Sequence, residues 1–268
     1  MIVFLPGIGG LVEARFLDCT DKSSDLARSV PIGQGGCDAL VLDPGNPRFV
    51  RVPDPIREAG IILSVRQVAI TNQADALVNE TVTLEGVQGA SMREYLVNVS
   101  PATRRSYLLG LLGAGTDLAD FAIENLEQAQ APLVLRLRYL LKSQFHLLDR
   151  ETAGALPMAF ERSWLAAESV EKRITPFQIA APLEFKSTIV LTVPAGFRAI
   201  DSTVLPRKLD NRFITCQIAS ERGADALTSH LRIFRPAGRH SAAEYGDFCI
   251  AMNGALGLLD EKFVMRKK

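Results

Sequence analysis

Apolar and polar residues alternate with a period of two along much of this chain, and this pattern constrains its fold more than any other feature. The clearest run has apolar side chains at every second position: Leu133, Leu135, Leu137 and Tyr139. Since successive side chains of a strand point to opposite faces, such a run predicts a β-strand with one buried face. Many runs of this kind, separated by turn residues, favour a mainly β fold, an antiparallel β-sandwich with a few helices.

The expected strands cover most of the chain. In one of them the alternation is imperfect, because Glu80 falls on the same side as the apolar Val78 and Val82. The first two expected strands form a hairpin, with Pro6 and Gly7 opening its turn. The predicted strands are 1–5, 11–17, 39–42, 49–52, 61–70, 77–85, 92–99, 118–126, 133–141, 160–165, 188–193, 213–219 and 226–234.

Two helices are expected to interrupt the strands. Ser100 followed by Pro101 is typical of an N-cap and a first helical position, and predicts a helix over about 101–112. Ser241 and Glu244 have the spacing of a capping box, which predicts a second helix over about 241–258. This helix carries an apolar stripe that we expect to pack against the sandwich, the alternative being a partner or cofactor face; the stripe comprises Tyr245, Phe248, Met252, Leu256 and Leu259.

The composition argues against several classes of function. Of the 268 residues, 47% are apolar, which is enough for one or two folded domains. The 30 Lys and Arg residues balance the 30 Asp and Glu residues, so the chain has no global attraction for nucleic acid or an anionic membrane. No uncharged stretch reaches the roughly 20 residues that span a bilayer. The four cysteines include no CxxC pair. We therefore expect no membrane span, no metal ion and no other cofactor.

One short motif carries a residue type suited to catalysis. The segment Phe16-Leu17-Asp18-Cys19-Thr20 places an aspartate just past the predicted strand 11–17. In a Cys-His-Asp triad such a carboxylate accepts the imidazole N–H and stabilises the imidazolium. The alternative is that Asp18 is an ordinary turn residue that hydrogen-bonds to nearby backbone. The 17 residues before Asp18 contain neither cysteine nor histidine.

The motif and its surroundings resemble the bacterial transglutaminase-like enzymes. An apolar strand, then the Phe16-to-Thr20 motif, a Gly-rich loop and the apolar run 39–42 are similar to the segment that follows the catalytic histidine in that family. The chain from about residue 61 onward resembles a β-rich C-terminal region of unknown function in such bacterial proteins. The matching features there are the segment 188–197 and the stretch 235–245.

This resemblance implies a division of the chain and a role for it. Residues 1–55 would be the remnant of a transglutaminase-like core and residues 56–268 a β-sandwich domain, with the boundary at Pro53-Asp54-Pro55. Asp18 would be an orphan triad carboxylate, catalytic only if the core were completed. The implied role is that of a non-catalytic fragment acting as a structural or binding module.

The resemblance also implies partners and a compartment. The expected partners are a transglutaminase-like core, a peptide or an envelope polymer. Proteins of this family are often directed to the envelope, which suggests the envelope or periplasm, although the opening residues do not have the pattern of a signal peptide.

A second interpretation is an active transglutaminase-like amidase or peptidase. It requires a cysteine and a histidine from outside this chain, or Cys19 acting with a histidine of the chain such as His146. His146 lies among Phe145 and Leu147, where a partly buried structural histidine is the alternative. His240 lies beside the predicted helix cap and is expected to face solvent.

We expect the purified chain to show no amidase or transglutaminase activity above background on peptide and amine substrates, because the triad is incomplete. Ammonia release and amine incorporation are the measurements. Activity that Cys19→Ala or Asp18→Ala abolishes would contradict this expectation and support the enzyme. Glu13→Ala, which removes a carboxylate outside the motif, serves as the matched control.

Overall fold

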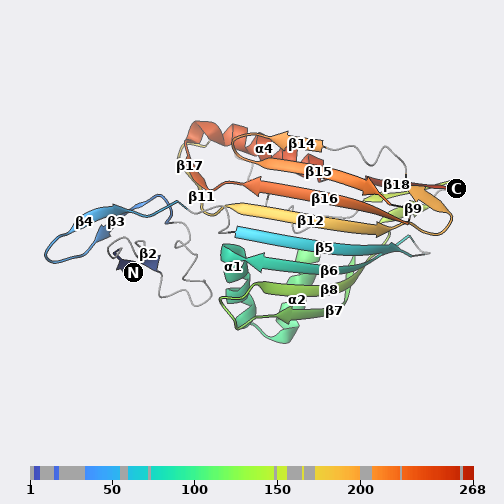
Figure 1. Cartoon of the computed structure of the whole chain (residues 1–268), viewed down its shortest axis with the longest axis horizontal. Coiled ribbons are helices and arrows are strands. Elements are labelled where there is room, and N and C mark those ends of the chain that lie inside the picture. Colours follow the sequence, from blue (N-terminus) through green and yellow to red (C-terminus); the bar gives the residue numbers. More distant parts are fainter. Residues whose placement is uncertain are drawn as a thin grey trace.

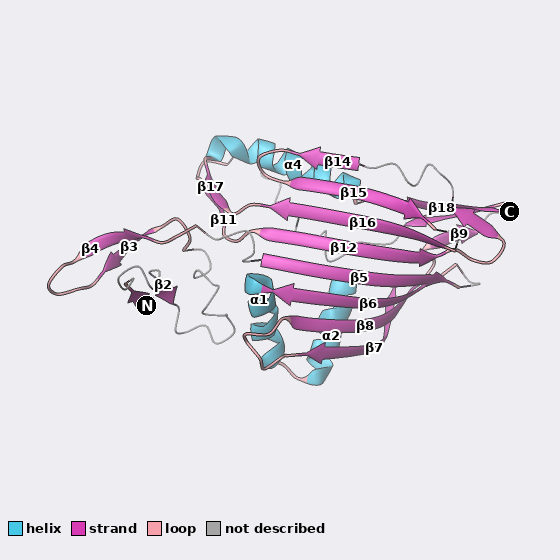
Figure 2. Ribbon diagram, viewed as in Figure 1, coloured by secondary structure: helices cyan, strands magenta, loops and turns pink. Residues whose placement is uncertain are grey.

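The structure of this chain is a computed structural model in which one large sheet dominates (Figure 1). It describes residues 3–6, 15–17, 34–54, 60–71, 74–147, 150–155, 165, 173–199, 207–223, 225–259 and 262–268. The described part is mainly β, as the alternating pattern predicts, with helices at the ends of the large sheet and behind it (Figure 2).

The large sheet has eight strands. Their spatial order is β14-β15-β16-β12-β5-β6-β8-β7. Neighbouring strands are antiparallel, except that β5 and β12 run parallel at the centre, from Ile61 opposite Glu184 to Ala69 opposite Thr192. In the order of the sheet, the strands are β14 (Arg207–Asp210), β15 (Thr215–Arg222), β16 (Ala226–Arg235), β12 (Leu183–Thr192), β5 (Gly60–Ile70), β6 (Ala76–Glu85), β8 (Leu133–Leu141) and β7 (Thr116–Glu124).

The parallel pair is not foreseen by the strand pattern. Alternation predicts which residues share a face, but it says nothing about the direction of the neighbouring strand. Parallel neighbours need a long crossover connection, and more than a hundred residues separate β5 from β12 in the sequence. The pairing is therefore a long-range feature that joins two antiparallel halves of the sheet.

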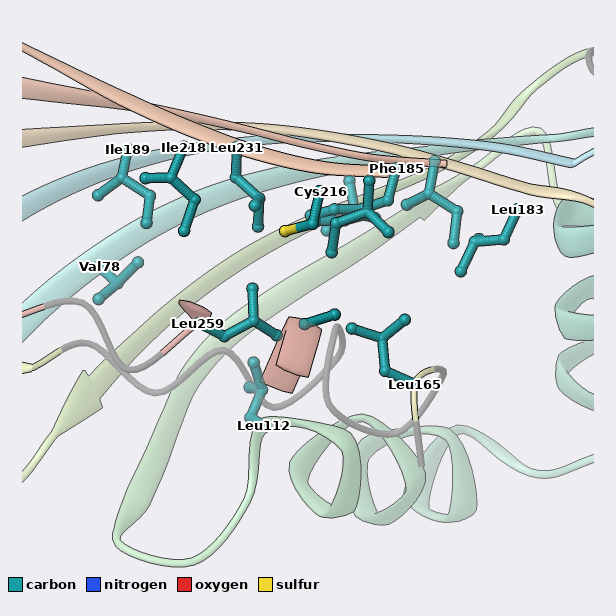
Figure 3. Close-up of a cluster of buried hydrophobic side chains, with 14 of the residues drawn as sticks. Val78, Leu112, Leu165, Leu183, Phe185, Ile189, Cys216, Ile218, Leu231 and Leu259 are labelled. Atoms are coloured by element: carbon teal, nitrogen blue, oxygen red, sulfur yellow. The ribbon is translucent and has the colours of Figure 1, made fainter. Parts of the chain in front are cut away.

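One face of the large sheet is buried under a second layer. Side chains of Phe185, Ile218 and Leu231 point from the sheet toward Leu112 and Leu259 on the opposite side of the core (Figure 3). A four-stranded sheet of order β13-β18-β10-β9 adds Phe263, Met265 and other residues to the same apolar cluster. Its strands are β13 (Phe197–Ala199), β18 (Lys262–Lys267), β10 (Glu151–Ala155) and β9 (Phe145–Leu147).

The two predicted helices form where their caps indicate. Helix α2 (Pro101–Leu112) begins after Ser100, whose Oγ accepts the Thr103 N–H at 3.2 Å. A 3-10 turn, η3 (Ala242–Glu244), has the expected capping box and continues into α4 (Tyr245–Leu258). The stripe of α4 is buried or partly buried against the core, which confirms its structural interpretation.

The predicted strand 92–99 is wrong. Most of it belongs to helix α1 (Gly86–Val97), in which Met92 and Leu96, four residues apart, both point into the core. Gly86 has φ +58°, which lets the chain turn abruptly from β6 into the helix. A short apolar segment fits both the two-residue period of a strand and the 3.6-residue period of a helix. Here the packing of Met92 and Leu96 in the core favours the helix.

Shorter strand pairs lie outside the two larger sheets. The predicted N-terminal hairpin is confirmed: β1 (Val3–Leu5) and β2 (Arg15–Leu17) are antiparallel. A second hairpin, β3 (Asp38–Val41) with β4 (Arg48–Arg51), extends away from the large sheet at the left of Figure 1. The pair β11 (Phe177–Ile179) and β17 (Gly238–His240) lies beside α4. The predicted strand 160–165 falls outside the described residues, except for Leu165.

Glu80, the charged residue on the apolar side of β6, is held by a buried hydrogen-bond network. The side chain of Glu80 is fully buried, and its two carboxylate oxygens accept hydrogen bonds from Ser64 Oγ at 2.7 Å, Arg66 Nε at 2.8 Å and Tyr139 OH at 2.7 Å. These residues come from the adjacent strands β5, β6 and β8. A buried charge is tolerated only when it is paired and hydrogen-bonded, and this network meets that condition.

Glu80→Ala should destabilise the protein by about 3–5 kcal/mol, because it leaves the Arg66 guanidinium buried without its counter-charge. Urea unfolding followed by circular dichroism measures the loss. Asn79→Ala, at the exposed neighbouring position, is the matched control. The double variant Arg66→Met with Glu80→Leu should be much less damaging, since it removes both charges. A loss for Glu80→Ala no larger than that for Asn79→Ala would refute this account.

Candidate functional site

The second face of the eight-stranded sheet is open. Side chains that alternate with the core positions point away from the second layer, and most of them are polar and either half-buried or exposed. Among them are Gln67 on β5, Asn79 on β6 and Arg138 on β8. An antiparallel sheet commonly has one solvated face, but this one is broad and rich in charges. We call it the open face.

Four polar side chains form a row across one half of the open face. The strand register places Lys186 of β12 opposite Arg232 of β16, Arg232 opposite Gln217 of β15, and Gln217 opposite Lys208 of β14. These four residues are called the cationic row below. Because directly opposite residues share a face, the four side chains all lie on the open side of the sheet.

A buried carboxylate organises one end of the row. Glu184 lies on β12 two residues before Lys186, so both side chains are on the open face. Glu184 Oε1 is 2.9 Å from Arg232 Nη2 and 3.3 Å from Lys186 Nζ. Its side chain is 6% exposed, whereas those of Lys186 and Arg232 are 48% and 51% exposed. One covered anion therefore holds two cations that still face solvent.

A hollow of about 730 Å³ lies over this half of the sheet. Besides the cationic row, its lining includes His230 of β16. It also includes Thr188, two residues after Lys186 on β12, and Ala219, two residues after Gln217 on β15. Thr188 Oγ1 and His230 Nδ1 are 3.2 Å apart, within hydrogen-bond distance. At the far end of the row, Lys208 Nζ is 2.8 Å from an oxygen of Asp210. The hydrogen bond from Lys208 lowers the pKa of the exposed Asp210 carboxyl.

A second hollow, of about 430 Å³, lies over the other half of the open face. Strands β5 to β8 line it with Val65, Gln67, Thr81, Ala122 and other residues, including Arg136 and Arg138. Arg136 Nε donates to Glu124 Oε1 at 2.6 Å, and this hydrogen bond raises the pKa of the guanidinium. No Phe, Tyr or Trp lines either hollow in the described part of the chain.

The structure does not test the residues that the sequence proposes for catalysis. Asp18 and Cys19 lie outside the described residues. His146 is on β9 at an exposed position, so the partly buried environment expected for it is not found. Its pairing with Cys19 stays a hypothesis.

His240 does not face solvent as expected. Its ring is half-buried in an aromatic cluster, with its centroid 5.0 Å from that of Phe177 and 5.1 Å from that of Phe213. The β11–β17 pair places His240 directly opposite Phe177, which accounts for the stacking. The capping box of Ser241 and Glu244 is correctly predicted. A capping box, however, does not indicate which side chains of the preceding strand β17 are buried.

The cationic row is what sequence reasoning missed. Its members lie on four strands, but Lys186 precedes the predicted strand 188–193 and Lys208 lies in β14, where no strand is predicted. The alternation therefore indicates an outward side chain only for Gln217 and Arg232. Only the register between strands shows that the four form one line.

Comparison with known proteins adds little. No protein-family model matches the chain, and no curated protein is significantly similar to it. One solved structure, described as a "putative protease" from Parabacteroides distasonis ATCC 8503, is 17% identical over 44% of this chain, with a TM-score of 0.36. The match covers only 24% of that protein. The resemblance to the transglutaminase-like family thus remains a prediction. No described helix is long and apolar enough to span a bilayer.

Among the described thiols, Cys216 is poorly suited to act as a nucleophile. It is fully buried on β15, and burial raises its pKa to about 11. The reactive form of cysteine is the thiolate, which burial in apolar surroundings disfavours. Cys216 is therefore a core residue.

The raised pKa of Cys216 predicts a loss of stability at alkaline pH. The unfolded thiol titrates near pH 8.5 and the folded one near 11, so between these values the unfolded state binds fewer protons. Stability should then fall as the pH rises through this window, by up to about 2–3 kcal/mol. Urea unfolding at a series of pH values measures it. Cys216→Ala should be less stable at neutral pH but should lose this part of the pH dependence. An unchanged dependence in the variant would contradict the assignment.

Proposed function

We propose that this chain is a non-catalytic binding module whose ligand lies on the open face of the eight-stranded sheet. The observation that carries the proposal is a broad exposed polar face with a hollow over each half. The buried Glu184 carboxylate, which holds Lys186 and Arg232 in place, supports it because these cations need little ordering when a ligand binds.

The chemistry of the hollows favours binding over catalysis. Their linings combine cations, amides, hydroxyls and apolar side chains, the second hollow adds Asp120 and the buried Glu80, and His230 is within hydrogen-bond distance of Thr188. Groups of this kind hold a polar or charged ligand. Thr188 and His230 are a hydroxyl and a base within hydrogen-bond distance, but none of the described residues that line their hollow is a carboxylate that could orient the imidazole, as in a catalytic triad.

As a finer proposal, the module belongs to a transglutaminase-like protein and presents a peptide or envelope polymer to its core. The sequence around Asp18 supports this, and so does the hairpin of β3 and β4. One face of that hairpin carries the cross-strand pair Leu40 and Phe49, which are 51% and 73% exposed. Exposed apolar side chains gathered on a protruding element are typical of a surface that packs against another protein.

A blocking experiment tests the binding module. The labelled chain is applied to arrays of peptides and of bacterial envelope polymers, and each ligand found is measured again with Ala122→Trp and Ala219→Trp combined. Both alanines are exposed and each lines one hollow, so the new rings should exclude a ligand without entering the core.

Affinity should fall by about tenfold or more in the blocked variant. Ala102→Trp, at an exposed position of α2, is the matched control and should bind normally. Ligands that bind the blocked variant as well as the original chain would place the binding surface elsewhere and refute the proposal.

A further inference from the structure

The cationic row has a definite length. Lys186 and Lys208 are three strands apart, and neighbouring strands are about 4.8 Å apart, so their positions on the sheet are separated by about 14 Å. An extended peptide rises about 3.4 Å per residue and presents every second side chain to the same side. Residues i and i+4 of such a peptide therefore point the same way and are also about 14 Å apart.

The charge of the hollow favours an anion. The row and its immediate partners include three cations, Lys186, Lys208 and Arg232, against two carboxylates, Glu184 and Asp210. Glu184 is covered, whereas the three cations and Asp210 are about half exposed. An incoming carboxylate therefore meets net positive charge at the Lys186–Arg232 end of the row, and at the other end it shares Lys208 with Asp210.

Between the two charged ends lies an amide. Gln217 is exposed at the position between Arg232 and Lys208, and its side chain offers both a donor and an acceptor. A peptide backbone, with one N–H and one C=O in each unit, can pair with both. A sugar ring is more often held by stacking on aromatic side chains, and the hollow has none in the described part of the chain.

We propose that this hollow binds an extended acidic peptide that lies across strands β12, β16, β15 and β14. One carboxylate of the peptide contacts Lys186 and Arg232, and a second, four residues along, contacts Lys208. Gln217 hydrogen-bonds to the backbone between them. This assignment rests on the proposed binding function and adds the class of ligand and its spacing.

Fluorescence anisotropy with short labelled peptides tests the spacing. The probe has two glutamates at i and i+4 separated by three threonines, which favour an extended chain. Two further peptides carry the glutamates at i and i+2, or glutamine in place of both. The i, i+4 peptide should bind several-fold more tightly than either, and added salt should weaken it because exposed charges are screened. Equal binding of the three peptides would overturn the proposal.

Charge-removing variants locate the site. Lys186→Gln and Lys208→Gln should each weaken binding of the i, i+4 peptide by about two- to fivefold, the range for single exposed ion pairs. Both leave Arg232 in place, so the buried Glu184 keeps a counter-charge. Lys142→Gln removes an exposed cation that lines neither hollow and is the matched control. A loss in Lys142→Gln equal to that in the lysine variants of the row would refute the site.

An acidic polysaccharide distinguishes failure of this inference from failure of the binding function. If a uronic acid polymer binds in a manner sensitive to Lys186→Gln while the acidic peptides do not, the ligand class is wrong and the binding module stands. If array ligands are lost in the Ala122→Trp and Ala219→Trp variant but none is acidic, the same conclusion follows. If the i, i+4 peptide binds the original chain and Ala219→Trp abolishes that binding, the result supports both the binding function and the acidic peptide as its ligand.

Discussion

The parallel pairing of β5 with β12 joins the two antiparallel halves of the large sheet. It continues without a break from Ile61 opposite Glu184 to Ala69 opposite Thr192. Because side chains alternate between faces, a shift of one residue here would turn the inner face of one half outward. The observed register instead places Ile62 beside Phe185 and Val68 beside Leu191, all on the buried side. The shared core depends on this alignment.

The open face depends on the same alignment. With the apolar positions of both halves turned inward, their polar positions form one continuous surface, which carries a hollow on each side of the central pair. Next to that pair, on the inner side, the network of Glu80 with Arg66, Ser64 and Tyr139 ties β5 to β6 and β8. These three strands, which lie beneath the second hollow, are thus joined by side-chain hydrogen bonds on the opposite face of the sheet.

Much of the fold can be predicted from the sequence. The strand 133–141 and the helix 101–112 have the predicted bounds, because each combines a strong period with clear boundary residues. The segment 92–99 is misassigned because a short apolar run fits a strand and a helix alike, and contacts of Met92 and Leu96 with distant residues decide between them. The irregular position of Glu80 is visible in the sequence. Its partners are not, since Tyr139 lies 59 residues away.

The sequence by itself determined which residues of the alternating strands face the core and where the capped helix α2 and the capped turn before α4 begin, because alternation and capping are local properties of the chain. The tertiary structure decided how the strands are ordered, that β5 and β12 run parallel, and that Lys186, Arg232, Gln217 and Lys208 lie in one row. The physical reason is that the candidate site is made of cross-strand neighbours. Such neighbours are set by hydrogen bonding between segments far apart in the chain, and a local pattern contains no information about them.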